Sequence, residues 1–170
     1  HDDVTGRLMF DALWRAAERG VRVRLLLDDN NTAGLDPLLA GLDAHPNVEV
    51  RLFHPFRQRS LRLLGFLTDF ARLNRRMHNK SITADGAATI VGGRNIGDEY
   101  FGLNPAFNFH DLDVLAAGPV AREASAVFDR YWNSGWAGRV PRPEGAKSGG
   151  AEPVGPPSLA IAGLDAGGRT

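Results

Sequence analysis

Apolar residues near the start of the chain are first spaced as in a helix and then run together as in a strand. Residues 5–19 carry apolar side chains at intervals that predict a helix with one buried face. These positions are Leu8, Ala12, Leu13 and Ala16. Asp3 or Thr5 is suited to cap the start of this helix, and Gly20 is a natural stop. Residues 21–27 are mostly apolar, which is typical of a strand buried on both faces.

A second helix and a second strand follow. Residues 35–44 predict a short helix with Pro37 near its first turn. Residues 48–53 alternate between apolar and polar side chains, as a strand does. Helices that alternate with strands in this way indicate an α/β fold, so we expect a mixed β-sheet flanked by helices.

The middle of the chain predicts a β-hairpin. Residues 81–83 suit a strand, and residues 87–91 suit the strand that returns. Between them, Asp85 and Gly86 form a dipeptide that favours a tight hairpin turn. The hairpin therefore brings the residues after position 91 back to the end where the first strand begins.

One more strand and helix are expected before the composition changes. Residues 111–117 suit a strand, and Pro119 begins a helix that runs to about residue 133. From Gly138 onward the chain is rich in Gly, Pro, Ala and Ser, which is typical of a linker.

These patterns divide the chain into three parts. We expect residues 1–137 to form one domain and residues 138–157 to form a Gly/Pro-rich linker. Residues 158–170 are expected to be the start of a following segment or a disordered tail. Within that last part, residues 158–162 suit a strand.

Composition and charge are ordinary for a globular domain. The sequence is 43% apolar and 24% charged, and its 20 basic residues balance its 20 acidic residues. A domain adapted to wrap nucleic acid would be strongly basic, so nucleic acid is the less suitable partner. The absence of cysteine excludes disulfides and thiolate metal sites. No run of about 18 apolar residues is present, so we expect no transmembrane segment in this stretch of sequence.

Positive charge is concentrated between Arg51 and Arg76. Seven arginines and one acid, Asp69, lie in this segment, interleaved with leucine and phenylalanine. One hypothesis is a basic amphipathic segment on an anionic lipid surface, where each basic residue contributes roughly 1 kcal/mol. The other is a helix packed on the sheet with its arginines solvated or paired. A nucleic-acid backbone would accept the same arginines, so charge alone does not identify the substrate.

Candidate chemistry lies around the predicted hairpin. His78 and Lys80 are separated by one residue, so in a strand they point to the same face. The returning strand would deliver Gly92, Gly93 and Asn95 to the same end. A neutral imidazole is a nucleophile or base near neutral pH, whereas an ammonium and an amide donate to negatively charged oxygens. The two glycines would let the backbone approach a ligand closely, and phosphate suits this set best.

Three sets of acidic residues have alternative interpretations. Asp28 to Asn31 could hold a hard cation, but we favour a loop at a strand's carboxyl end, where Asp28 would line a pocket. Asp98 and Glu99 follow Asn95 and are better suited to anchor a loop or cap a helix than to transfer protons. Asp85 falls on the opposite face of a regular strand from Lys80, so we interpret it as structural.

The motif His78-x-Lys80-x4-Asp85, followed by Gly92-Gly93-Arg94-Asn95, resembles the HKD signature of the phospholipase D superfamily. The continuation Ile96 to Phe101 (IGDEYF) resembles the bacterial cardiolipin synthase branch, and the chain is similar to its N-terminal half. The resemblance implies a phospholipase D/nuclease-like α-β-α sandwich that forms one half of a pseudo-symmetric enzyme.

The resemblance also implies a mechanism. A histidine attacks phosphorus to give a phosphohistidine, and an alcohol or water then releases the phosphoryl group without a metal or cofactor. By this resemblance His78, Lys80 and Asn95 are catalytic, Asp85 is a structural member of the motif, and Gly92, Gly93 and Asp113 bind substrate. Asp111 or Asp113 would lie near the site, with a hypothetical role in orienting His78. A second motif, in the missing half or in a partner chain, would protonate the leaving oxygen.

Three functions follow from these observations. The leading prediction is phosphatidyl transfer on a phosphatidylglycerol-like phospholipid by a protein associated peripherally with the bacterial cytoplasmic membrane. A second is a nuclease of the same superfamily that acts as a dimer. A third is a non-catalytic lipid-binding half-domain. We expect the isolated chain to be poorly active, because it carries one motif only.

Overall fold

The computed structural model describes residues 3–29, 32, 34–55, 77–140 and 158–162. Within these residues the chain forms one seven-stranded sheet and three α-helices. In chain order the elements are α1 (Val4–Glu18), β1 (Arg22–Asp28), α2 (Asp36–Asp43), β2 (Val48–Phe53), β3 (Lys80–Ala84), β4 (Ala88–Gly92), the 3-10 helix η3 (Asp98–Tyr100), β5 (Asp113–Ala117), α5 (Pro119–Trp132), β6 (Ala137–Arg139) and β7 (Ser158–Ala162). The predicted α/β fold with a mixed sheet is confirmed.

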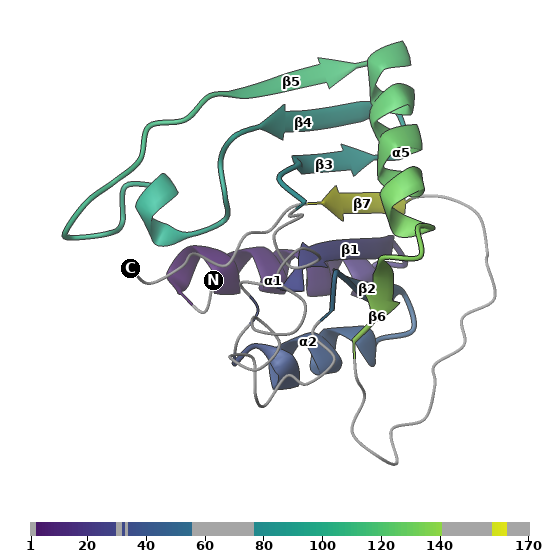
Figure 1. The fold of residues 1–170 in the computed structure, drawn as a ribbon, viewed down its shortest axis with the longest axis horizontal. Helices are drawn as coiled ribbons and strands as arrows, with labels where there is room; N and C mark the ends of the chain where they lie inside the picture. The colour runs from purple at the N-terminus through teal and green to yellow at the C-terminus, as the bar shows by residue number, and fades with distance from the viewer. Residues whose placement is uncertain (1–2, 30–31, 33, 56–76, 141–157, 163–170) are drawn as a thin grey trace.

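The sheet has the strand order β5-β4-β3-β7-β1-β2-β6 (Figure 1). The strands β7, β1 and β2 run parallel to one another. The hairpin strands β3 and β4, together with β5, are antiparallel to their neighbours. As a result, the carboxyl ends of β1, β2, β7 and β4 and the amino ends of β3 and β5 lie at the same side of the sheet. This row of strand ends is called the site edge below, and it is distinct from the outermost strands β5 and β6.

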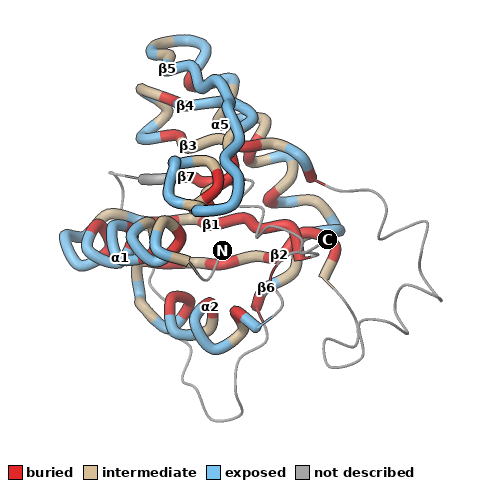
Figure 2. The backbone as a smooth tube through the Cα atoms, turned by 90° about the vertical axis from the view of Figure 1, so that its left-hand side faces the viewer, coloured by how far each residue is buried: buried red, intermediate tan, exposed pale blue. Residues whose placement is uncertain are grey.

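Helices cover both faces of the sheet. On one face, α1 and α2 pack on Val23, Leu25 and Leu27 of β1 and on Ile161 of β7. On the other face, Phe128 and Trp132 of α5 pack with Leu26 and with alanines of β7. Because alternate residues of β1 enter the two cores, its nearly continuous apolar sequence is explained by burial on both faces. Figure 2 shows this buried centre at β1 and the more exposed backbone of β4 and β5.

The helix boundaries follow from local signals. Asp3 caps α1, because its carboxylate accepts a hydrogen bond from the Gly6 amide at 2.8 Å. Gly20 adopts a positive φ of 88° just after the helix, as predicted for its stop. Pro119 occupies the first turn of α5, also as predicted.

The end of the chain is arranged differently from the expectation of a separate segment. Residues 158–162 do form a strand, but β7 lies inside this sheet, parallel to β1 and antiparallel to β3. Residues 137–139 lie at the boundary between the expected domain and the expected linker. They form β6, the outermost strand of the sheet beside β2, and Val140 is buried. Three residues are too few to show a strand period, which explains why β6 was not predicted.

The predicted basic segment lies mostly outside the described residues. Arg51 is described: it belongs to β2, forms an ion pair with Glu49 at 2.8 Å, and lies 4.4 Å from the Trp132 ring centroid. No helix among the described residues is long and apolar enough to cross a membrane.

Candidate active site

The histidine and lysine of the HKD motif lie at the site edge, where the strand ends meet. His78 precedes β3, Lys80 is its first residue, and Gly92 is the last residue of β4. Asp28, at the carboxyl end of β1, accepts a hydrogen bond from the Met77 amide at 2.8 Å and so fixes the entry to the motif. Asp28 is buried at this edge, where the sequence placed it. Among the described residues, no three His, Asp or Glu side chains gather as a metal site.

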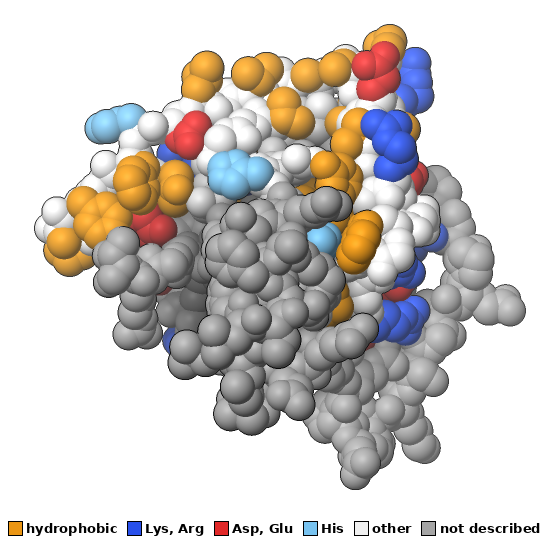
Figure 3. Space-filling model, viewed as in Figure 1, with side chains coloured by type: hydrophobic (Ala, Val, Ile, Leu, Met, Phe, Trp, Pro, Cys, Tyr) orange, Lys and Arg blue, Asp and Glu red, His pale blue; other side chains and the backbone are white. Residues whose placement is uncertain are grey.

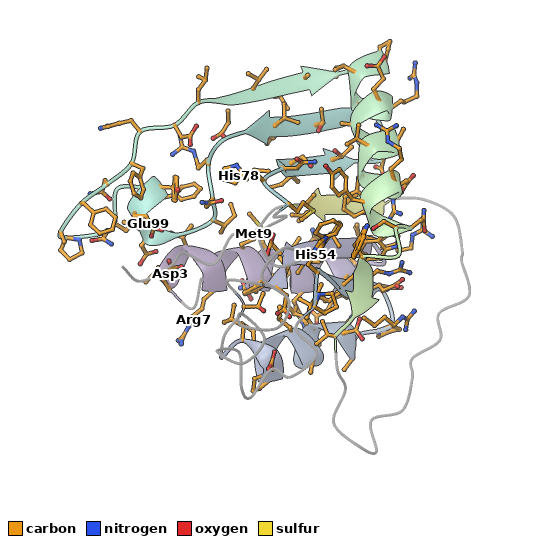
Figure 4. All side chains as sticks on the ribbon, in the orientation of Figure 1. Asp3, Arg7, Met9, His54, His78 and Glu99 are labelled. Atoms are coloured by element: carbon orange, nitrogen blue, oxygen red, sulfur yellow. The ribbon has the colours of Figure 1, made fainter. Side chains whose placement is uncertain are left out.

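The structure brings His78 and Lys80 together. The Lys80 Nζ lies 3.2 Å from the His78 Nδ1, and it also donates to the His78 carbonyl at 3.1 Å. His78 is exposed, whereas Lys80 is buried, with 8% of its surface accessible. Since an ammonium only donates, Nδ1 accepts, and a neutral ring in this arrangement carries its proton on Nε2. Figure 4 shows His78 beside the start of β3.

Three residues of adjacent strands stand in register beside this pair. Lys80 of β3 is opposite Gly92 of β4, and Gly92 is opposite Asp113 of β5. A Cβ at Gly92 would overlap the Asp113 Oδ1 and would lie 2.6 Å from the Leu112 carbonyl oxygen. Glycine is therefore required here, because the backbone of β5 leaves no space for a side chain.

The second glycine also lies under a carboxylate, although no backbone atom is among the three nearest to a Cβ added there. A Cβ at Gly93 would lie 2.5 Å from the Asp111 Oδ1. The sequence predicted that both glycines open the backbone to a ligand, and the structure instead shows carboxylates over both of them. Their contact with substrate stays a prediction.

Arg94 holds this arrangement together, a role that was not predicted from the sequence. Its Nε donates to the Asp113 carboxylate at 2.6 Å, and one terminal nitrogen donates to the Asp111 carbonyl at 2.8 Å. The other terminal nitrogen donates to the Tyr100 carbonyl. Arg94 thus joins both ends of the loop between η3 and β5. The hypothesis that Asp111 or Asp113 orients His78 finds no contact in its support, since Asp113 is paired with Arg94 and the Asp111 carboxylate accepts from the Leu112 amide.

Asn95 is buried at the same edge and contacts Tyr100. Its Nδ2 lies 3.0 Å from the Tyr100 hydroxyl, and its Oδ1 is buried without a hydrogen-bond partner. An unsatisfied buried amide oxygen costs about 1–3 kcal/mol. Since Nδ2 carries two hydrogens, it can donate to the Tyr100 hydroxyl and still has a second hydrogen to donate. Tyr100 was not singled out from the sequence, because nothing in the spacing of residues 95 and 100 predicts their contact.

Asp85 is at the far end of the hairpin. Asp85 and Gly86 have positive φ values of 54° and 63°, and the Ala87 amide donates to the Ala84 carbonyl at 2.9 Å. This is the geometry of the tight turn that the Asp-Gly dipeptide predicts. The other end of the hairpin carries Lys80, so this placement agrees with a structural role for Asp85.

Asp98 anchors the η3 loop to α1. The Thr5 amide and hydroxyl both donate to the Asp98 Oδ1, at 2.8 and 2.7 Å, and the Asp98 amide donates to Asp3. The hydrogen bonds from the Thr5 hydroxyl and amide lower the pKa of Asp98. The loop-anchoring interpretation of Asp98 is confirmed, and Glu99 beside it is buried.

Pockets lie on both faces of the sheet next to Lys80. A pocket of about 260 Å³ on the α1 face is lined by Lys80, Gly92, Arg94 and Asp113 together with apolar side chains. A wider pocket of about 400 Å³ on the α5 face is lined by His78, Lys80 and residues of α5. The motif therefore adjoins space for a ligand on either side.

Comparison with known proteins supports the family that the motif indicates. The family model described as "Cardiolipin synthase, PLD-like domain" matches residues 3–132. The chain is 65% identical over 131 residues to cardiolipin synthase C of Escherichia coli, which covers 77% of this chain and 28% of that protein. It is 33% identical over 132 residues to the major cardiolipin synthase ClsA of Bacillus subtilis, covering 77% of this chain and 26% of that protein.

The matched region is a small part of each relative. An uncharacterized protein of Helicobacter pylori is 45% identical over 136 residues, again covering 77% of this chain and 26% of that protein. The chain thus spans about a quarter of the length of these curated relatives. No solved structure matches. Since the family model covers most of the chain, including the whole HKD motif, the chain belongs to the family of cardiolipin synthase, phospholipase D-like domains.

Proposed function

We propose that this chain is one catalytic half of an enzyme that transfers phosphatidyl groups between alcohols, with a phosphatidylglycerol-like lipid as donor. The observation that carries the proposal is the contact of a buried lysine ammonium with an exposed histidine, 3.2 Å apart. A nucleophile beside a fixed positive charge suits attack on an anionic phosphodiester. Membership of the family and the names of its relatives support the lipid substrate.

In the first step a ring nitrogen of His78 attacks phosphorus. A P–N bond forms, and the P–O bond to the leaving alcohol breaks. The ammonium of Lys80 binds the phosphoryl oxygens as their negative charge increases. Phosphate oxygens also compete with the His78 Nδ1 for this ammonium, which releases the imidazole for attack.

In the second step the acceptor alcohol attacks the phosphohistidine. Its oxygen bonds to phosphorus, the P–N bond breaks, and the alcohol proton goes to a base. The amide of Asn95 donates to the phosphoryl oxygens with the second hydrogen of its Nδ2, the first being directed at the Tyr100 hydroxyl.

The proton transfers need a second histidine. We propose that it comes from a second HKD half, either further along the same chain or in a partner chain. The half-domain then comprises residues 1–137 together with β6 and β7, which complete its sheet. This agrees with the span of the chain, about a quarter of its curated relatives. The enzyme would bind the membrane peripherally, at an anionic surface.

The test is transphosphatidylation in the protein that contains both halves. With phosphatidylglycerol as donor and ethanol as acceptor, we expect phosphatidylethanol, because a covalent phosphatidyl-enzyme reacts with alcohols as well as with water. His78→Ala and Lys80→Met should each lower its formation by at least about 10³-fold. The matched control is His110→Ala, on the exposed loop after η3, which should retain the wild-type rate.

Two results would overturn the proposal. One is phosphatidylethanol formation that survives His78→Ala. The other is hydrolysis of a DNA or RNA phosphodiester that depends on His78, with no reaction of lipid, which would make the protein a nuclease.

A further inference from the structure

The pocket on the α1 face continues the phosphate site into an apolar space. Lys80 and Gly92 belong to its lining, and its volume is about 260 Å³. Its apolar lining comes from α1, the sheet and the segment after β4, at Met9, Ile82, Ile90, Ile96, Phe101 and Ile161. Figure 4 shows Met9 on α1 below His78.

The charges at this pocket favour an anion at its polar end. Two cations, Lys80 and Arg94, line it with one anion, Asp113. Arg94 and Asp113 form an ion pair at 2.6 Å, so the sum of the three charges is positive on the side of Lys80. A phosphodiester complements that charge, and the rest of the pocket offers mostly hydrocarbon to whatever is attached to the phosphate.

Of the groups that a phosphodiester carries, an acyl chain suits this lining best. A nucleobase or sugar would lose hydrogen bonds to water without finding donors and acceptors among isoleucine, methionine and phenylalanine side chains. A hydrocarbon chain has no hydrogen bonds to water that it could lose there. Each methylene that moves from water into the pocket raises the affinity about fourfold. The volume suffices for only a part of a lipid, since pockets that enclose a whole drug-sized ligand have roughly 300–1,000 Å³.

We propose that this pocket binds the glycerol end of one acyl chain of the phospholipid while its phosphate is bound at Lys80. The inference rests on the proposed function, because it takes the bound phosphate to be a phosphatidyl group. It adds a site that binds the hydrocarbon part of the substrate, next to the site that binds its phosphate.

The pocket borders a second apolar surface. Phe101, which lines the pocket, begins a loop in which Leu103, Phe107 and Phe109 are exposed. Figure 3 shows the hydrophobic side chains gathered over this loop, at the left of the molecule. The loop is held in shape by the Asn104 side chain, which accepts from the Ala106 amide at 2.9 Å, and by Arg94 at its two ends. A lipid chain that enters by this route stays in contact with apolar side chains.

The test compares the binding of three phosphodiesters with the same head group. These are glycerophosphoglycerol, dibutyryl phosphatidylglycerol and dioctanoyl phosphatidylglycerol, each below the concentration at which it forms micelles, measured by titration calorimetry on the 170-residue chain. We expect dioctanoyl phosphatidylglycerol to bind at least about tenfold more tightly than the dibutyryl lipid, since a few methylenes suffice for that gain.

A matched pair of variants shows whether the increase in affinity with acyl-chain length comes from this pocket. Ile90→Trp fills the pocket from β4, whereas Leu115→Trp places the same ring on β5, at the position paired with Ile90 but outside the pocket. Both side chains are exposed, at 42% and 72%, so both variants should fold, which thermal melting checks. Ile90→Trp should remove the chain-length gain and leave glycerophosphoglycerol binding within about twofold, and Leu115→Trp should keep the gain.

Each other result overturns the inference in a distinguishable way. If the head group binds and affinity does not rise with chain length, the pocket does not bind the chain while the proposed function stands. If the gain survives Ile90→Trp, the chain binds elsewhere. If none of the three binds, the proposed function fails and this inference fails with it.

Discussion

At the scale of single residues, the site depends on the absence of a side chain at Gly92. Lys80, Gly92 and Asp113 are in register across three strands, and the Asp113 carboxylate folds over the glycine to meet Arg94. Gly92 thus has Lys80 opposite it on one neighbouring strand and Asp113, paired with Arg94, opposite it on the other. This geometry makes a prediction for stability.

Gly92→Ala should destabilise the protein by about 1–3 kcal/mol, because the new Cβ would meet the Leu112 carbonyl oxygen, a backbone atom that cannot turn aside. Gly41→Ala is the matched control: Gly41 lies in α2 with nothing within 4 Å of its added Cβ. Alanine there should stabilise by up to about 1 kcal/mol. Urea unfolding of both variants checks this, and equal free energies of unfolding would contradict the steric account.

Some of these residues could be predicted from the sequence and others could not. His78 and Lys80 were predicted to share a face of a strand; the two side chains are in contact, although His78 precedes β3. Asp85 was predicted to be structural from the Asp-Gly turn and lies at the turn. The roles of Arg94 and Tyr100 depend on contacts with carbonyl groups and side chains far along the chain, to which local spacing is blind.

At the scale of elements, the loop after Asn95 is tied to the start of α1. Asp98 accepts two hydrogen bonds from Thr5, and Asp3 both caps the helix and accepts from the Asp98 amide. These contacts connect the loop that carries Asn95 to the helix that lines the apolar pocket. They also give the folded protein a dependence on pH.

Hydrogen bonds lower the pKa of Asp98 in the folded protein. Its contribution to stability is therefore complete above the ordinary pKa of aspartate, about 3.9, and is lost as the pH falls below that value. Asp98→Asn should lower the melting temperature at about pH 7, and the difference from wild type should shrink at about pH 3.

The control for this prediction is Asp11→Asn, which removes an exposed carboxylate paired with Arg15 on the same helix. It should change the melting temperature little at either pH. A deficit of Asp98→Asn that is the same at both pH values would show that the charge of Asp98 has no part in the contact.

The helices and strands themselves follow well from local patterns. Residues 48–53 were predicted and observed as a strand without an error in either boundary. The helix α1 differs from the predicted residues 5–19 by one residue at each end, and α5 differs by one residue at its carboxyl end. Pairing between strands is a different matter. Residues 158–162 were expected to be a strand, but their place between β1 and β3 depends on partners more than seventy residues away, which no local pattern encodes.

At the scale of the whole molecule, the sheet brings every part of the site to one edge. Asp28 at the end of β1, the motif at the start of β3, and Gly92 at the end of β4 all lie there. Ligands of open α/β sheets bind at the carboxyl ends of parallel strands. The exposed apolar loop lies at the same edge, and under the proposed function it would face the lipid surface from which the substrate comes.

The proposed mechanism implies that one half is insufficient for turnover. In it, attack by His78 needs only this chain, but an alcohol leaving group needs a proton donor on the other side of the phosphorus. Attack and turnover are thus separable, and the first can be observed alone if the leaving group requires no proton.

The most direct measurement is the intact mass of this chain after incubation with phosphatidyl-p-nitrophenol, whose phenolate departs without protonation. We expect an increase by the mass of one phosphatidyl group, at a site mapped to His78 by fragmentation, and no increase in His78→Ala. An adduct that persists in His78→Ala, or no adduct on a wild-type chain that binds the lipid, would contradict nucleophilic catalysis by His78.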